Sequence, residues 1–232
     1  MRVLAVGGIF SALLFLPAHS DPVYPHAYPR QGVRQLFDNE RVTVWEAVWK
    51  HGVAQPFHRH RYDMAAVYLQ FGRIRVTTPE GTVVEPKPFD PPFAYFQRKG
   101  ITHKEEGAGK PGDPEELAII VDLKETAPSE FQLPPGMKPA FPRDGAKNVL
   151  ENDRVRMWDY TWLEKTPVGW HVHDYDAVEV YVNGGTILTK FGDGHQETWP
   201  VAFKEARYIP RGQRDYEEAV SGTPRAITIE LK

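Results

Sequence analysis

Residues 58–72 read HRHRYDMAAVYLQFG, and residues 171–185 read HVHDYDAVEVYVNGG. The second stretch begins 113 residues after the first and shares with it both histidines, the tyrosine–aspartate pair and the closing glycine. The same offset places NERVTVWEAVW (39–49) over NDRVRMWDYTW (152–162) without a gap. Agreement of this density at one fixed offset indicates a duplication. We call the two repeats the first copy and the second copy.

Each copy has the composition of short strands. The apolar runs at 66–68 and 178–182 are brief and rich in β-branched or aromatic residues, and no segment has a long amphipathic helical period. Glycine and asparagine near 70–72 and 183–185 predict hairpin turns. The expected fold class is therefore all-β, as a sandwich or barrel.

The domain boundaries follow from the prolines. Five of them lie between Glu125 and Arg143, which excludes a regular strand or helix there. We predict a first domain at 21–124, a proline-rich linker at 125–143 and a second domain at 144–232.

Residues 1–20 differ from the rest of the chain. Arg2 supplies a positive start, residues 3–16 are apolar apart from two glycines and a serine, and small residues precede Asp21. This layout is typical of a signal peptide, and it is too short to span a bilayer stably. We expect cleavage after residue 20, a periplasmic or secreted protein, and no membrane attachment afterwards. The alternative is a buried N-terminal strand or helix.

Composition excludes several classes of function. The 232 residues carry a formal net charge of −3, which becomes −4 when Arg2 is removed, and they include no cysteine. A mildly acidic protein lacks the basic face that nucleic-acid binding requires, so no nucleic-acid partner is expected. Without cysteine there can be no disulfide, thiolate zinc site or cysteine nucleophile.

The spacing of the histidines resembles a known family. Gly52, five residues, His58-Arg59-His60 and eleven residues to Gly72 resemble the first motif of the cupin superfamily, and 98–103 (RKGITH) resembles the second. The resemblance implies a bicupin, that is, two tandem cupin-type jelly-roll β-barrels. In that family two first-motif histidines, a glutamate and a second-motif histidine bind a divalent metal.

The residues themselves favour a metal site in the first copy. Histidines at i and i+2 of a strand project from the same face, so His58 and His60 can face one interior, and His103 can join them from a separate strand. Neutral imidazole suits several divalent ions, and Fe, Mn, Zn and Ni are not distinguished. The alternative is that these histidines only fill the interior.

The second copy departs further from the family pattern. It offers His171, His173 and Asp215, a set that we expect to be weaker because the short aspartate must approach closely. The motif glutamate position falls on Ala65 in the first copy and on Val178 in the second. Glu179 comes one residue late, and strict alternation predicts that it points away from the histidines unless a bulge intervenes.

Other carboxylates recur in both copies. Asp63 and Asp176 could replace the missing ligand, orient a histidine or bond to their own backbone. Glu105 and Glu217 lie two residues beyond the second-motif ligand position and are candidate general bases, with an exposed rim position as the alternative. The tryptophans are expected in the core. They are Trp45, Trp49, Trp158 and Trp162.

These features favour a metal-dependent enzyme that acts on a small organic molecule, by oxygenase, isomerase or lyase chemistry. Fold alone does not choose a reaction. A non-catalytic small-molecule-binding protein and a structural bicupin with a degenerate metal site, whose copies serve a homodimer, are the alternatives. The sequence leaves open whether the protein is an enzyme, and which substrate it would take.

Overall fold

The computed structural model describes residues 23–127 and 130–232, and every element within these ranges is a β-strand. The all-β prediction is confirmed. No helix in the described part of the chain has the length and apolar character needed to cross a membrane. The predicted signal peptide lies outside the described residues.

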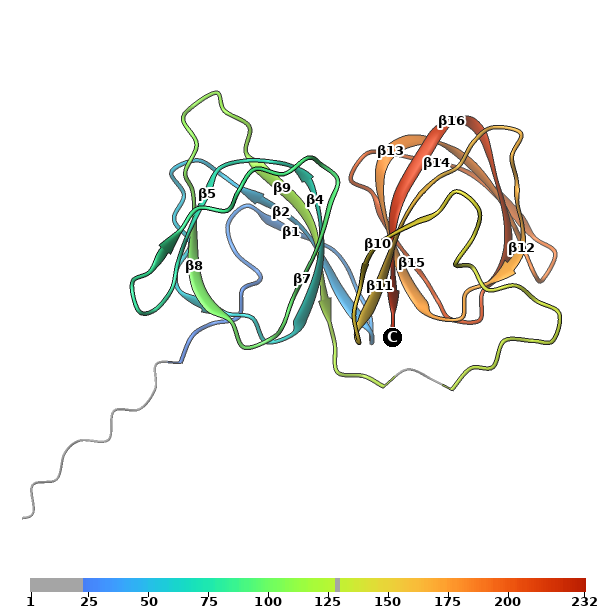
Figure 1. The fold of residues 1–232 in the computed structure, drawn as a ribbon, viewed down its shortest axis with the longest axis horizontal. Coiled ribbons are helices and arrows are strands. Elements are labelled where there is room, and N and C mark those ends of the chain that lie inside the picture. Colours follow the sequence, from blue (N-terminus) through green and yellow to red (C-terminus); the bar gives the residue numbers. More distant parts are fainter. Residues whose placement is uncertain (1–22, 128–129) are drawn as a thin grey trace, which may run out of the picture.

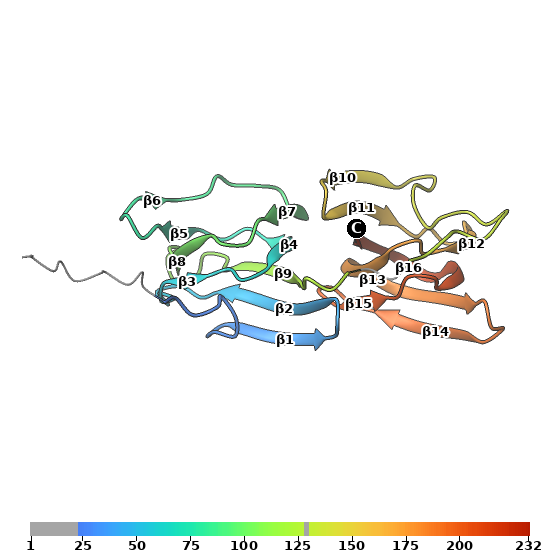
Figure 2. The same cartoon turned by 90° about the horizontal axis from the view of Figure 1, so that it is seen from below.

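The first copy forms two antiparallel sheets (Figures 1 and 2). One has the strand order β1-β2-β9-β4-β7 and the other the order β3-β8-β5-β6. Their bounds are β1 (Val33–Asp38), β2 (Val42–Trp49), β3 (His58–Arg59), β4 (Asp63–Gln70), β5 (Ile74–Thr77), β6 (Val83–Val84), β7 (Phe93–Gln97), β8 (Thr102–Gly107) and β9 (Glu116–Leu123).

The second copy forms one sheet with the order β10-β11-β16-β13-β14, joined by β12 on β16 and β15 on β13. Its bounds are β10 (Lys147–Glu151), β11 (Val155–Thr161), β12 (Val168–Val172), β13 (Asp176–Phe191), β14 (Gln196–Val201), β15 (Ala206–Ile209) and β16 (Arg214–Leu231). In the described residues the strand pairing leaves every sheet open, so the predicted closed barrels are not seen.

Both predicted hairpin turns are wrong. Residues 70–72 connect β4 to β5, which lie in different sheets and do not pair. The chain does not reverse at 183–185; β13 runs through this segment with register shifts against β16. A side chain at Gly185 would place its Cβ 2.6 Å from Pro224, so the glycine permits a close approach of strands rather than a hairpin. The two long strands β13 and β16 thereby bend as a pair.

Strand β2 is buried on both faces, which explains why its polar and apolar residues alternate poorly. Trp45, Ala47 and Trp49 pack inside the first copy, while Val42 and Val44 face the second copy. The four tryptophans predicted in the core are buried, at most 8% exposed.

The two copies share an apolar interface. Val44 and Val121 from the first copy belong to one core cluster with Met157, Val180 and Ile229 from the second. This cluster lies between the facing sheets of the two halves, β2-β9-β4 and β11-β16-β13 (Figure 1). Burial of this surface holds the halves together.

Reciprocal ion pairs frame the interface. Arg41 Nε lies 3.1 Å from Asp176 Oδ2, and Arg154 Nε lies 3.6 Å from Asp63 Oδ2. Both pairs use the same two repeat positions, one from each copy, as in an interface with twofold symmetry. The other carboxylate oxygens accept hydrogen bonds from the backbone N–H groups of Lys99 and Arg211, each at 2.9 Å.

These contacts decide between the three roles considered for the two aspartates. Asp63 and Asp176 are engaged with arginines of the opposite copy and with the loops that carry the second motif. In the described chain neither aspartate contacts a histidine, so they fill none of the three roles: they neither replace the metal ligand, nor orient a histidine, nor bond to their own backbone as ordinary loop aspartates do.

The proline-rich segment ends inside the second copy. Ala140 and Phe141 are buried, and Pro139 forms a bridge to Val172. The sequence Phe141-Pro142-Arg143 repeats Tyr28-Pro29-Arg30 at the same offset of 113 residues. The predicted domain boundaries remain predictions, but the packing assigns 139–143 to the second copy.

Candidate metal centres and the adjoining cavity

Three histidines meet inside the first copy. His58 on β3 pairs directly with His103 on β8, and His60 follows just beyond β3. The Nε2 atoms of His60 and His103 are 3.2 Å apart, and one ring nitrogen of each histidine lies within 4.8 Å of the others. Two nitrogens bound to one ion at about 2.1 Å are separated by about 3 Å, so this pair already has the spacing of co-ligands.

The environment leaves these rings free to coordinate. His58 Nδ1 bonds to the carbonyl of Pro56 at 3.0 Å, while its Nε2 is buried without a partner in the described chain. Burial lowers the pKa of His58 to about 4 and that of His60 to about 3, and it also lowers that of His103. The rings are neutral at pH 7, which is the form that binds metals. The residues present therefore fit a divalent ion.

The second copy brings together its own set. Asp215 Oδ1 lies 2.8 Å from His171 Nε2 and 3.6 Å from His173 Nε2, and all three side chains are buried. His171 Nδ1 bonds to the carbonyl of Gly169 at 2.9 Å, matching the contact of His58 with Pro56. The aspartate reaches both rings, so the side-chain length that we expected to weaken this set is no obstacle.

The charge of Asp215 changes the chemistry of the second set. Burial disfavours its charge, but the hydrogen bonds to His171 and His173 hold its pKa well below the usual range. Burial also lowers the pKa of His171, but its bond to Asp215 and the charges of Glu217 and Asp215 together outweigh burial and raise the pKa overall. Two histidines and one carboxylate are donors that a divalent ion accepts.

The candidate bases Glu105 and Glu217 are not at an exposed rim. Glu105 Oε2 lies 2.5 Å from Arg30 Nη1 and accepts a hydrogen bond from Trp49 Nε1 at 2.9 Å. Glu217 Oε2 accepts hydrogen bonds from Arg143 Nη1 at 3.1 Å and from Trp162 Nε1 at 3.0 Å. Both carboxylates are buried. We call this arrangement the arginine–tryptophan clamp.

The clamp makes Glu105 a weak base. Burial raises its pKa, but Arg30, His103 and His58 outweigh burial and lower the pKa to about 2. A group that far below neutral pH accepts a proton poorly. Its free oxygen, Oε1, lies 3.5 Å from His103 Nε2, so Glu105 places a fixed negative charge beside the histidines.

Sequence reasoning missed the arginines of the clamp. Arg30 lies over the rings of Tyr28 and Trp49, and Arg143 lies over those of Phe141 and Tyr160. The sequence did contain a signal for them, because the dipeptide Pro29-Arg30 recurs as Pro142-Arg143 at the repeat offset. The second occurrence lies in the segment that was interpreted as a linker.

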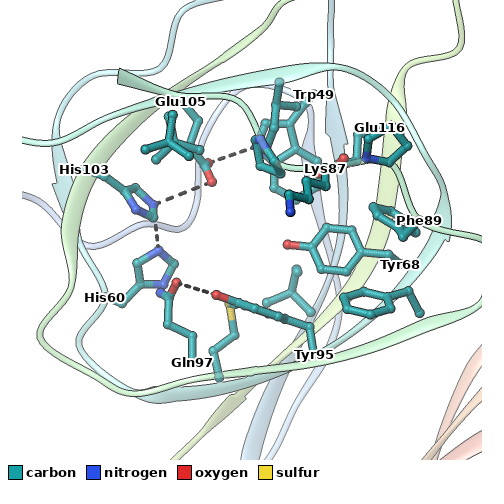
Figure 3. A pocket seen from close by; sticks show the side chains of 18 of the residues that line it. Trp49, His60, Tyr68, Lys87, Phe89, Tyr95, Gln97, His103, Glu105 and Glu116 are labelled. Atoms are coloured by element: carbon teal, nitrogen blue, oxygen red, sulfur yellow. Dashed lines mark hydrogen bonds and ion pairs between the residues drawn. The ribbon is translucent and has the colours of Figure 1, made fainter. Parts of the chain in front are cut away.

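A cavity of about 590 Å³ opens beside the first-copy histidines (Figure 3). His60, His103 and Glu105 lie on one side of it, and Tyr68, Phe89 and Glu116 lie on the other. Most of the wall is aromatic or aliphatic. It is formed by Tyr28, Trp49, Met64, Tyr68, Ile74, Val76, Val84, Pro86, Pro88, Phe89, Phe93, Tyr95 and Ile120, with Lys87 and Gln97 as further polar members.

Comparison with known proteins identifies the fold. No family model matches the sequence, and no curated protein matches it. Solved structures do. AerE from Microcystis aeruginosa is 11% identical with a TM-score of 0.62, over 90% of this chain and 98% of that one. A Bacillus subtilis oxalate decarboxylase with Mn(II) centres is 12% identical with a TM-score of 0.56, over 83% and 69%. A cupin 2 conserved barrel domain protein from Leptotrichia buccalis is 13% identical with a TM-score of 0.51, over 86% and 88%. The chain has a cupin fold.

Within this cupin fold, the interpretation of the motif glutamate needs correction. Ala65 and Val178, the positions assigned to it, face the interface between the copies. Glu179 is fully buried on the opposite face of β13, on the side of Tyr181, whose hydroxyl donates to it at 2.7 Å. It therefore points into the second copy, contrary to the prediction. The reason is that Val178, the assumed ligand position, faces the interface, so the next residue along β13 faces the interior.

The interior of the second copy is occupied by side chains. Tyr181 and Trp162 are buried there, and Arg207 stacks over Trp199 with its guanidinium carbon 3.5 Å from the ring centroid. Trp199 takes the repeat position that Pro86 holds in the cavity wall of the first copy. Large side chains thus lie where the first cupin copy has space. The second copy has its own cavity of about 570 Å³ at a different place, between residues 138–144 and 166–171, with His171 in its lining.

Proposed function

We propose that this chain is an exported bicupin whose first copy binds a divalent metal through His58, His60 and His103 and acts on a small organic molecule held in the adjoining cavity. The second copy, with His171, His173 and Asp215, is a second metal site. Side chains fill the space that corresponds to the first-copy cavity, and a separate cavity of about 570 Å³ lies beside His171. The observation that carries the proposal is a cluster of three buried, neutral histidines, two of which, His60 and His103, line a largely apolar cavity.

Each group has a definite task in this proposal. A divalent ion held by three protein ligands keeps open positions for a water or a substrate oxygen and polarises what it binds. The aromatic wall excludes water and takes up the carbon skeleton of the substrate. The clamped Glu105 keeps a negative charge beside His103, which helps to hold a cation without consuming a proton.

A non-catalytic binding role is the second candidate. One observation favours it: the carboxylate nearest to the histidines is bound to Arg30 and Trp49 and is a poor base. In that role the metal and the cavity would hold a ligand without converting it. Turnover of a bound ligand, or its absence, separates the two candidates.

Metal loading tests the proposal directly. The mature chain is stripped, reconstituted separately with Mn²⁺, Fe²⁺, Ni²⁺ and Zn²⁺, and analysed for metal per chain. We expect at least one equivalent, and its loss in the double variant His58→Ala/His60→Ala. His195→Ala is the matched control, because His195 is exposed and bonds only to Asp193 and Glu197 outside both clusters. An unchanged metal content in the double variant would refute the site.

Export is tested by the N-terminus of the mature protein. Mass spectrometry of the periplasmic or secreted form should find Asp21 as the first residue. Mature protein that retains Met1 would contradict this part of the proposal.

A further inference from the structure

The side of the cavity opposite the histidines carries its own polar groups. Lys87 extends from the segment between β6 and β7, and in Figure 3 its amino group points into the cavity. The hydroxyl of Tyr68 points into the same space. In the described chain neither Lys87 nor the Tyr68 hydroxyl has a hydrogen-bond or ion-pair partner. We call Lys87, Tyr68 and Glu116 the distal group.

Glu116 is the buried member of this group. Only 2% of it is exposed, and the backbone N–H of Gly72 bonds to its carboxyl. Burial, with a smaller effect of the Glu105 charge, raises the pKa of Glu116 from 4.5 to about 8. The carboxyl is therefore neutral at pH 7 and can donate a hydrogen bond, so it does not cancel the charge of Lys87.

The backbone is built to admit Glu116. A Cβ at Gly72 would lie 2.1 Å from the backbone nitrogen of Glu116, so no side chain fits at this position. Gly72, the closing glycine of the first motif, thus allows the backbone at Glu116 to approach closely. Glu116 also continues the interior face of β9, with Ala118 and Ile120 at alternate positions.

Between the histidines and the distal group the walls are flat. The rings of Trp49 and Tyr68 stack with centroids 6.1 Å apart, and those of Phe89 and Phe93 stack at 5.1 Å. Such walls favour a planar, unsaturated body over a sugar or a flexible polar chain. Near the histidine side, Gln97 Nε2 is buried without an acceptor, which suits an oxygen on the ligand.

We propose that the first-copy cavity takes a flat, unsaturated organic acid, with its carboxylate between Lys87, Tyr68 and Glu116 and an oxygen substituent directed at the histidines. Only the placement of the oxygen substituent at the histidines rests on the proposed function; the placement of the carboxylate does not. A cation, a phenol hydroxyl and a neutral carboxyl supply three donors to a carboxylate, which is the acceptor-only group that such a set fits.

Calorimetric titration of the Mn²⁺-loaded mature chain tests the orientation. The probes are 4-hydroxycinnamate and its methyl ester, which share the same flat body and differ at the carboxyl end, where the ester carries a methyl group in place of the negative charge. We expect Lys87→Met to weaken binding of the acid about tenfold, the scale of a charge-assisted hydrogen bond, and that of the ester less than about twofold. Tyr68→Phe should act in the same direction. Lys110→Met is the matched control, because Lys110 lies in a loop outside the cavity.

Three results would overturn the proposal. They are equal loss of acid and ester in Lys87→Met, no loss of either, and no binding of either probe to the wild-type chain. Repeating the titration on metal-free protein separates the two hypotheses. Lys87-dependent binding of the acid without metal supports the distal group even if the metal site fails. Metal loading without any Lys87 dependence would refute the distal group alone.

Discussion

The two copies share a framework and differ in what that framework encloses. In both, a buried glutamate is held by an arginine and a tryptophan, and two histidines stand two residues apart beside it. The first copy then leaves about 590 Å³ beside its histidines. The second fills the corresponding space, with Trp199 under Arg207, and its cavity of about 570 Å³ lies instead beside His171, with Lys138 and Arg143 in its lining. The clamp and the paired histidines recur and serve the fold or the metal, whereas Lys87 and Glu116 occur in the first copy only and serve a ligand in our proposal.

The largest expected difference between the copies is in how strongly metal binding affects ligand binding. His60→Ala should lower the metal affinity of the first copy on the order of a hundredfold or more and remove any metal dependence of ligand binding. His173→Ala should lower the metal affinity of the second copy alone and leave ligand binding within about twofold. Titration of both variants with Mn²⁺, followed by the ligand, measures this. If His173→Ala removes the ligand response and His60→Ala keeps it, the roles of the copies are reversed.

The clamp should be equally important in both copies. Replacing Arg30 or Arg143 by methionine leaves Glu105 or Glu217 as a buried, unpaired charge, and we expect each variant to lose about 3–5 kcal/mol of unfolding free energy. Urea denaturation measures the loss. Arg34→Met is the control, because Arg34 is 69% exposed in its pair with Glu46 and should cost less than about 1 kcal/mol. A large loss in one copy only would show that the clamp is not a shared structural device.

The reciprocal ion pairs at the interface should differ modestly in strength. Arg41 is 14% exposed and lies 3.1 Å from Asp176, whereas Arg154 is 27% exposed and lies 3.6 Å from Asp63. Asp63 also contacts Arg98 at 3.3 Å, which can compensate for the loss of Arg154. Double-mutant cycles should give a coupling of about 1–2 kcal/mol for Arg41–Asp176 and under about 1 kcal/mol for Arg154–Asp63. The reverse order would mean that burial does not set their strength.

A further effect depends on pH and is confined to the second copy. Burial raises the pKa of Glu230 from 4.5 to about 7, although Trp158 Nε1 donates to it at 2.8 Å. Because the folded pKa exceeds the unfolded one, its stabilisation is complete below about 4.5 and is lost as the pH rises through 7. Glu230→Gln stays neutral, so its stability relative to wild type should rise between pH 5 and pH 8, on the order of 1–3 kcal/mol. Thermal unfolding at both pH values measures this.

The first-copy counterpart of Glu230 provides the contrast. Asp122 also accepts a tryptophan N–H, from Trp45 at 3.0 Å, but it has a second contact with His26 at 3.1 Å. Asp122→Asn should therefore destabilise the chain. A relative gain for Glu230→Gln that does not change with pH would contradict the linkage.

The repeat made most of the fold predictable. A fixed offset gave the duplication, and the i, i+2 spacing of His58 and His60 correctly placed both beside His103. The prediction from strand alternation failed at Glu179. Both faces of β13 are buried, so the pattern of apolar residues did not show which face points into the second copy. The partners of Glu105 could not be deduced from spacing, since Arg30 and Trp49 reach it from segments far away in the sequence.

Two members of the distal group, Lys87 and Glu116, could not be found from the sequence for a different reason. Glu116 opens an apolar strand and Lys87 lies among prolines, and neither has a counterpart at the aligned position of the second copy. A search guided by the repeat finds what the copies share, so it passes over residues that one copy alone acquired. The alternation of Glu116 with Ala118 and Ile120 was the single available clue.

The exchanged Arg41–Asp176 and Arg154–Asp63 contacts bear on ancestry. A surface that presents an arginine and an aspartate at these two positions around an apolar centre is complementary to itself, so a chain of one repeat would associate with an identical chain through the same face. The covalent connection between the copies then raises the effective concentration of one half around the other, without adding specificity. Once both subunits are encoded together they can also diverge separately. One half keeps an apolar cavity beside its histidines, while the other fills the corresponding space with side chains and has a cavity at a different place, beside His171.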